Sequence, residues 1–181
     1  MALELVPLVR ETAPAVEAFL AAVDESRPSL SRWMPWCHAE YGRADVERWF
    51  AESDRMWREQ SAFSMWLREG GSVLGTAGLH DIQRYGKREG EIGYWVRQSA
   101  RGRGVASTAI RTMAAFAFNE LQLARTSLRI RLENASSRRA ADRAGARFEG
   151  ILRHGIVHGD ARFDAALYSL LPGDLARTWA P

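Results

Sequence analysis

A short turn rich in glycine and arginine is the segment of this sequence with the clearest capacity for chemistry. Residues 101–106 read Arg-Gly-Arg-Gly-Val-Ala, and an apolar pattern typical of a helix runs from Gly104 to Leu121. Glycine permits backbone conformations closed to other residues and lets a ligand approach the backbone closely. The first turn of a helix also has free N–H groups and a partial positive charge. The turn is therefore a candidate phosphate site, to which Arg101 and Arg103 could add charge.

Two familiar phosphate-binding motifs do not fit this turn. A P-loop requires Gly-x-x-x-x-Gly-Lys-Ser/Thr, which the sequence lacks. A dinucleotide fingerprint requires a third small residue after Gly102 and Gly104, and Ser107 matches it only approximately. On its own residues, the turn is equally consistent with a plain strand–helix connection that carries solvated arginines.

The remaining histidines and the single cysteine give weaker signals. His154 and His158 are four residues apart on an expected strand, which separates them by about 13 Å, too far to share one metal ion. Cys37 adjoins His38, but no third group completes a nucleophile–base arrangement. We therefore expect no metal site. A lone cysteine forms no internal disulfide, which fits a reducing cytoplasm.

The elements that must position the turn follow a mixed α/β order. A strand at 91–96, the turn, the long helix and a strand at 126–132 favour two parallel strands joined by a right-handed crossover. A first helix after Thr12 should end at Pro28, and a second should start near Ala44. Further elements are expected as strands at 3–10, 62–68, 72–80, 147–157 and 162–171, a polar loop at 81–90, and a short helix capped by Asn134 and ending at Gly145.

The bulk composition favours one globular domain over residues 1–181. The sequence is 46% hydrophobic and 26% charged, with a net charge of only +3, so the arginines are balanced by acids. Mixed charge and tryptophans at core-like spacing argue against an RNA-binding protein. We see no signal peptide and no stretch of about 18 apolar residues. We therefore expect a cytoplasmic protein with no nucleic-acid or membrane partner.

Together with its neighbours, the turn resembles a motif of a known enzyme family. Arg101, Gly104 and Ala106 take the defining places of motif A, [RQ]-x-x-G-x-[GA], of the GCN5-related N-acetyltransferase (GNAT) superfamily. Downstream, 134–137 and 144–150 resemble the N-x-x-S … G-F-x-x-E-G run of its RimJ/RimL-type branch, which includes enzymes that acetylate the N-termini of ribosomal proteins. Ala146, where the branch usually has phenylalanine, is one departure.

The resemblance covers nearly the whole chain and implies a fold. The expected GNAT fold is α/β (α+β), with a mixed central sheet of about six to seven strands flanked by about four helices. Its fourth and fifth strands splay apart, and the gap receives the cofactor. The cosubstrate would be acetyl-CoA, and no metal would be needed.

The resemblance also implies a role for each matching residue. The pyrophosphate would take the backbone amides of Gly102, Arg103, Gly104, Val105 and Ala106, and Trp95, Val96 and Arg97 would pair with the pantetheine arm. Asn134 would hydrogen-bond the pantetheine, although its position also suits a helix cap. Ser137 would lie near the sulfur and protonate the departing thiolate.

The implied reaction is direct attack of a neutral amine on the thioester, with a backbone N–H near Val96 as the oxyanion donor. An α-amine with a pKa of about 7.7–8 loses its proton easily near neutral pH, whereas lysine, at about 10.4, does not. Glu91, at the start of the fourth strand, is the candidate base, and Tyr94 is an alternative proton carrier. Trp33 and Trp36 could form a wall of the acceptor site.

The acceptor and the assembly state remain open at this point. A protein or peptide N-terminus is the favoured acceptor, with a small amine such as an antibiotic or polyamine as the alternative. A non-catalytic acyl-CoA-binding module that regulates a partner is the other hypothesis. A homodimer is one option for the oligomeric state.

Overall fold

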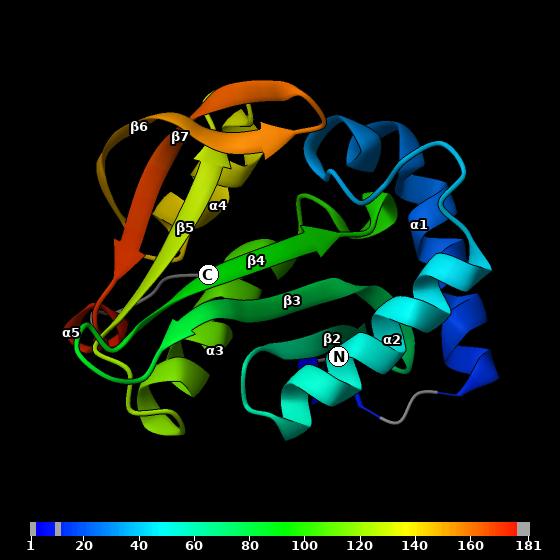
Figure 1. Cartoon of the computed structure of the whole chain (residues 1–181), viewed down its shortest axis with the longest axis horizontal. Coiled ribbons are helices and arrows are strands. Elements are labelled where there is room, and N and C mark those ends of the chain that lie inside the picture. Colours follow the sequence, from blue (N-terminus) through cyan, green and yellow to red (C-terminus); the bar gives the residue numbers. More distant parts are fainter. Residues whose placement is uncertain (1–2, 10–11, 177–181) are drawn as a thin grey trace.

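A seven-stranded mixed sheet runs through the computed structural model, which describes residues 3–9 and 12–176 (Figure 1). Its strands lie in the order β1-β2-β3-β4-β5-β7-β6. The strands are β1 (Glu4–Pro7), β2 (Phe63–Glu69), β3 (Ser72–Gln83), β4 (Glu89–Val96), β5 (Arg125–Arg131), β6 (Arg147–His158) and β7 (Ala161–Leu170). The helices are α1 (Ala13–Trp33), α2 (Arg43–Arg58), α3 (Val105–Asn119), α4 (Ala135–Arg143) and the short α5 (Pro172–Leu175).

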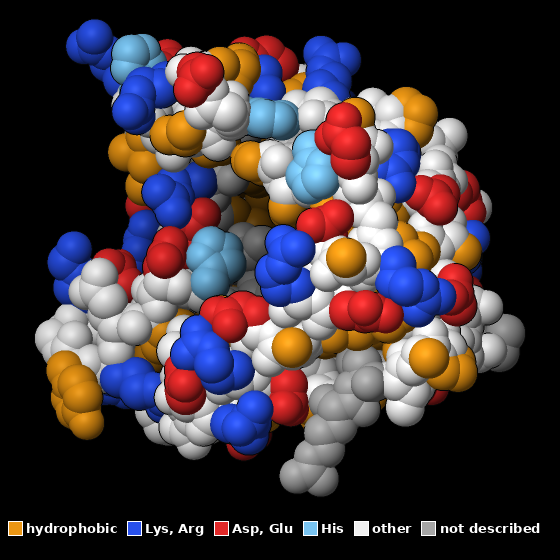
Figure 2. Space-filling view, turned by 45° about the vertical axis from the view of Figure 1, so that its right-hand side comes forward, with side chains coloured by type: hydrophobic (Ala, Val, Ile, Leu, Met, Phe, Trp, Pro, Cys, Tyr) orange, Lys and Arg blue, Asp and Glu red, His pale blue; other side chains and the backbone are white. Residues whose placement is uncertain are grey.

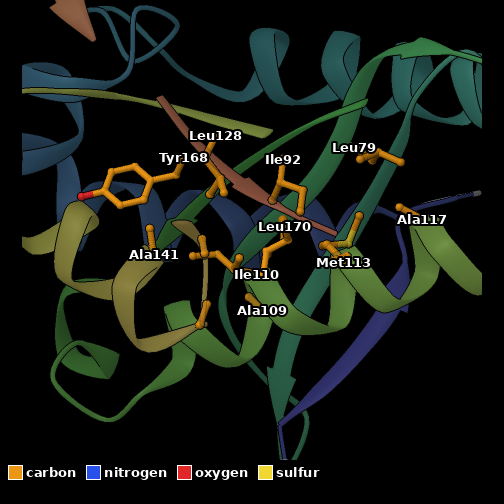
Figure 3. Packing of buried hydrophobic residues seen from close by; sticks show 14 of the residues in the cluster. Leu79, Ile92, Ala109, Ile110, Met113, Ala117, Leu128, Ala141, Tyr168 and Leu170 are labelled. Carbon is orange, nitrogen blue, oxygen red and sulfur yellow. The ribbon is translucent and has the colours of Figure 1, made fainter. Parts of the chain in front are cut away.

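Each face of the sheet has its own hydrophobic core. Because side chains alternate along a strand, Trp66 packs with residues of α1 and α2, whereas its neighbour Leu67 packs in the core that α3 and α4 cover. Ile110 and Met113 of α3 enter the second core (Figure 3). Phe19 of α1 lies at the centre of the first core, where its ring contacts four other aromatic rings.

The parallel strands β4 and β5 stay together over a short distance and then separate. Their register runs only from Glu89↔Arg125 to Glu91↔Ser127. Beyond these residues β4 remains paired with β3 as far as Val96, and β5 remains paired with β7. The predicted mixed sheet and the predicted splay of the fourth and fifth strands are therefore confirmed, and the gap between the strands is visible in Figure 1.

One predicted helix end was wrong: α1 does not stop at Pro28 but continues to Trp33. A proline inside a helix removes one hydrogen bond at a cost of about 3 kcal/mol, but tertiary contacts can outweigh that cost. Leu30 is buried in the core, and the Ser29 hydroxyl accepts a hydrogen bond from Arg101. The last turn of α1 is thus held from outside the helix.

Two further elements also differ from their expected bounds. Residues 81–90 are not one loop, because β3 extends to Gln83 and pairs it with Glu89 across a bulge. The described residues form five α-helices, of which α5 is a short extra turn, in agreement with the expected number of about four. The predicted strand at 3–10 is shorter, and its last residue lies outside the described residues. Within residues 3–9 and 12–176, no helix is long and apolar enough to cross a membrane. Basic and acidic side chains are interspersed on the face of the molecule that Figure 2 shows.

Candidate cofactor and acyl-transfer site

The turn between β4 and α3 presents backbone groups rather than side chains. Gly104 is the N-cap of α3 with φ +82°, and Gly102 has φ +77°, the left-handed region that glycine adopts without strain. Among the described residues, no side chain caps α3 at Gly104. A Cβ on Gly102 would meet open space. The turn therefore keeps the N–H groups of the first helical turn available for an anion.

A cavity of about 290 Å³ lies next to this turn and joins β4, α1, α3 and α4. Ten of the residues predicted from the sequence line it: Trp33, Trp95, Val96, Arg101, Gly102, Gly104, Val105, Ala106, Asn134 and Ser137. Ser29, Leu30 and Met34 of the α1 region close it from the other side. The open edge of β4, the start of α3 and the start of α4 thus meet in one place.

The three arginines around the turn are oriented differently. Arg101 lines the cavity and donates to the Val96 carbonyl at 3.1 Å and to the Ser29 hydroxyl at 2.9 Å. Arg103 instead pairs with Glu69 at the end of β2, and Arg97 pairs with Glu25 of α1. Of the three, only Arg101 is among the cavity's lining residues, and the Arg97 N–H donates to the Leu74 carbonyl on β3.

Asn134 and Ser137 are joined at the start of α4. The Asn134 side chain caps the helix by accepting from the Ser137 backbone N–H at 3.1 Å and from the Ser136 hydroxyl at 2.9 Å. Both Asn134 and Ser137 also line the cavity, so the cap and a ligand contact are compatible.

Tyr94 reaches Ser137 across the gap between the strands. Its hydroxyl lies 2.7 Å from the Ser137 Oγ, which joins β4 to α4. Burial raises the pKa of the Tyr94 phenol, and the hydrogen bond to Ser137 partly opposes this rise. Tyr94 therefore keeps its proton at neutral pH. The pair places two hydroxyl groups on the cavity wall beside β4.

Glu91 occupies a different position from Tyr94 and Ser137. Its side chain is 15% exposed and accepts a hydrogen bond from Arg129 Nε at 2.6 Å. Arg129 stands on β5, two residues beyond Ser127, so this ion pair spans the point where the strands diverge. Glu91 therefore lies at the apex of the gap, away from the turn at 101–106.

The two predicted wall tryptophans line different cavities. Trp33 lines the cofactor-side cavity, and the guanidinium of Arg131 lies 5.2 Å from its ring centroid. Trp36 lines a second cavity on the α1/α2 face, where its ring lies 5.0 Å from Tyr41 and 6.2 Å from Trp95. Trp95 borders both cavities and separates them.

Two arginines that the sequence reasoning did not single out also line the first cavity. Arg139 and Arg143 stand one helical turn apart on α4, on the side of the helix toward the α3 N-terminus. Both arginines follow Asn134, the cap of this helix, at i, i+4 spacing. This spacing could have indicated that they lie on the same face of the helix. They add positive charge to a cavity that already has the α3 N-terminus and Arg101.

Comparison with known proteins agrees with this architecture. Residues 2–147 match the family model "Acetyltransferase (GNAT) domain". The putative ribosomal N-acetyltransferase YdaF of Bacillus subtilis (strain 168) is 34% identical over 119 residues, which is 64% of this chain and 64% of that protein. The match thus spans slightly less than two thirds of the relative's own length.

Solved structures share the fold at low sequence identity. Mycobacterium smegmatis RimJ in complex with CoA-disulfide superimposes with a TM-score of 0.84 at 20% identity, covering 96% of this chain and 88% of that one. Spermidine N-acetyltransferase from Vibrio cholerae, in complex with CoA and spermine, has a TM-score of 0.76 at 16% identity, covering 97% and 98%.

The Vibrio cholerae structure is named for the polyamine spermidine, whereas YdaF is named as a putative ribosomal N-acetyltransferase, so the shared fold alone does not select an acceptor. The family match, the splayed strands and the glycine turn agree with one another. The chain belongs to the acetyltransferase (GNAT) domain family, and its relatives include the RimJ/RimL-type ribosomal-protein acetyltransferases expected from its motifs.

Proposed function

We propose that this protein transfers an acetyl group from acetyl-CoA to the α-amine of a protein or peptide N-terminus. The observation that carries the proposal is the cavity in which the uncapped start of α3 meets the open edge of β4. A diphosphate needs a cluster of N–H donors, and an extended amide-containing arm needs an unpaired strand edge. This cavity offers both.

The residues present fit the cosubstrate. Backbone N–H groups at 102–106 would hold the pyrophosphate, with Arg101, Arg139 and Arg143 adding charge around it. The edge of β4 at 95–97 would pair with the pantetheine amides, and Asn134 would provide a further polar contact. Acetyl-CoA, when bound, supplies a thioester that an amine can attack.

The side chains near the gap would manage the two proton transfers. The Tyr94–Ser137 pair is positioned to protonate the departing thiolate, because both hydroxyls lie on the cavity wall. The proton of the attacking amine must leave in another direction. Glu91, at the apex of the gap, is the base expected from the sequence, and it accepts a hydrogen bond from Arg129.

The second cavity favours a peptide over a free polyamine. Asp45 and Glu52 line it and would be the natural partners of a polycation. However, Asp45 already accepts from the Gly42 N–H at 3.0 Å, and Glu52 accepts from Arg55 at 2.9 Å. A polycation would compete with these partners for the carboxylate oxygens. A neutral peptide backbone could instead lie along the aromatic surface of Trp36 and Trp95.

An acceptor screen tests the proposal. Purified protein and acetyl-CoA would be incubated with peptides that have free or blocked N-termini, with polyamines and with aminoglycosides, and released CoA thiol would be measured. We expect release with free N-terminal peptides and not with blocked ones. Release with small amines alone would establish the alternative acceptor class. Cofactor binding without release on any amine would establish a non-catalytic acyl-CoA-binding module.

The Glu91→Gln variant tests the predicted base within this scheme. If Glu91 accepts the proton, turnover should fall while acetyl-CoA affinity stays unchanged, because the side chain lies away from the 101–106 turn. A variant rate equal to that of the wild type from pH 6 to 9 would remove Glu91 from the chemistry.

A further inference from the structure

A histidine and an aspartate lie on the opposite side of β4 from Tyr94 and Ser137. His80 pairs in register with Glu91, so the two side chains lie on the same face of the sheet. This is the α1/α2 face, because Trp95, four residues beyond Glu91 on β4, packs in the core of α1 and α2. The His80 side chain is 45% exposed, so water and an acceptor can reach it.

A glycine on the neighbouring strand makes room for the imidazole. A Cβ placed on Gly93 would lie 3.2 Å from His80 Nε2, closer than an ordinary contact. The ring therefore lies over the β4 backbone at Gly93. This position is two residues beyond Glu91, where β4 has already separated from β5. Nε2 is thus next to the opening of the gap, on the face opposite the Tyr94 hydroxyl.

The chain conformation at Asp81 brings its carboxylate to the same imidazole. Asp81 has φ +51°, and it occupies the bulge where the β3–β4 register shifts. Its Oδ2 lies 3.4 Å from His80 Nδ1 and 3.2 Å from the Nη2 of Arg129. A carboxylate beside Nδ1 favours the tautomer with the proton on that nitrogen, which leaves a lone pair on Nε2.

Three charged groups lie beside His80 on this face: the carboxylates of Asp81 and Glu91 and the guanidinium of Arg129. When the imidazole is neutral, the cluster contains two negative charges and one positive charge. A proton on His80 makes the cluster neutral, whereas a proton on Glu91 breaks its 2.6 Å pair with Arg129.

We propose that His80 accepts the proton of the attacking amine, and that Asp81 orients its imidazole. The inference rests on the proposed acetyl transfer. The amine nitrogen forms a bond to the thioester carbonyl carbon while the C–S bond breaks, and the sulfur leaves with the bonding electrons. The amine proton passes to His80 Nε2, directly or through one water, and then to solvent. Glu91 becomes a positioning residue that holds Arg129 against Asp81.

The pH dependence of kcat/KM for a peptide acceptor tests this assignment. In the wild type, log kcat/KM should fall with a slope near two below about pH 6, because both an α-amine and a histidine must be unprotonated. His80→Gln should reduce the slope to one and lower kcat at pH 8 about 100-fold. Glu91→Gln should retain the slope of two. His158→Gln, a histidine change at the end of β6, is the matched control.

A second readout does not depend on turnover. In the neutral imidazole of His80, the share of the tautomer with its proton on Nδ1, followed by 15N NMR, should fall in Asp81→Asn, because the carboxylate beside Nδ1 favours that tautomer. An equal share in both proteins, or a His80→Gln enzyme with a slope of two and a rate within about twofold of the wild type, would overturn the assignment. Failure of the wild type to acetylate any amine would overturn the proposed function itself.

Discussion

The two faces of the gap between β4 and β5 present different kinds of chemical group. On the α3/α4 face, the groups facing the cavity at the turn are largely backbone: Gly102 and Gly104 expose the N–H groups of the first turn of α3. On the α1/α2 face the groups are side chains, with His80, Asp81 and Arg129 brought together by strand register. A site built from backbone groups depends on glycines at fixed positions in the sequence. A site built from side chains depends on which residues are paired between neighbouring strands.

The largest expected effect is on the backbone site. Gly104→Glu places an anion in the proposed phosphate cradle and should weaken acetyl-CoA binding about 100-fold or more, which corresponds to about 2.7 kcal/mol. Gly71→Glu is the matched control, because Gly71 also has φ +82° and open space, but it lies in the β2–β3 turn. Calorimetric titration of both variants measures the effect. Equal affinities would show that the phosphate binds elsewhere.

The next effect tests how β3 supports the edge of β4. A Cβ on Gly75 would lie 2.1 Å from the carbonyl oxygen of Trp95, and Gly75 has φ +145°. Gly75→Ala should therefore cost about 2 kcal/mol of unfolding free energy and weaken acetyl-CoA binding as β4 shifts. Urea denaturation, with Gly71→Ala as the control, measures the cost. An unchanged midpoint would mean that β3 does not fix this part of β4.

A smaller effect is expected at the hydroxyl pair on the α3/α4 face. Ser137→Ala removes a partner of Tyr94 and should lower kcat about tenfold, because a thiol with a pKa of about 8.5 needs little help in leaving. The KM for acetyl-CoA should stay the same. If Ser137→Ala and Tyr94→Phe act as one unit, the double variant should be no slower than the slower single variant.

The smallest effect lies outside both faces and depends on pH. Hydrogen bonds from Arg125 and Ser169 lower the pKa of Glu149 to about 2. A carboxyl whose pKa is lower in the folded state stabilises the fold above its unfolded pKa, about 4.3, and loses that contribution as pH falls toward 2. The Glu149 side chain is 36% exposed, so we expect less than about 1 kcal/mol.

Thermal melts between pH 7 and pH 2.5 check this last prediction. The wild type should lose more stability than Glu149→Gln between pH 4.5 and pH 2.5, and Arg125→Met should reproduce the variant's flatter profile. Parallel profiles for all three proteins would show that the ion pair contributes nothing to the acid response.

The difference between the two faces also explains what the sequence could predict. Glycines at fixed spacing before a helical pattern locate a backbone site directly, and residues 101–106 were placed correctly at the start of α3. Local spacing also predicted Asn134 as a helix cap, and its side chain caps α4. Its contact with pantetheine was expected from the family resemblance and stays a prediction.

Contacts that depend on distant elements were harder to predict. His80 and Asp81 fell in or next to a segment interpreted as a loop, and the bulge in β3 places Asp81 between His80 and Arg129. Pro28 suggested the end of a helix, because sequence spacing does not reveal that Leu30 is buried or that Arg101 contacts Ser29. Strand register and tertiary contacts determine these features, and neither is visible in the local sequence.

The most direct test of the central claim is a crystal structure of this protein with acetyl-CoA bound. The account predicts pyrophosphate oxygens within about 2.7–3.2 Å of the backbone nitrogens of residues 102–106, and pantetheine amides paired with the open edge of β4. A pyrophosphate bound away from the start of α3, or a thioester outside the gap between β4 and β5, would contradict it.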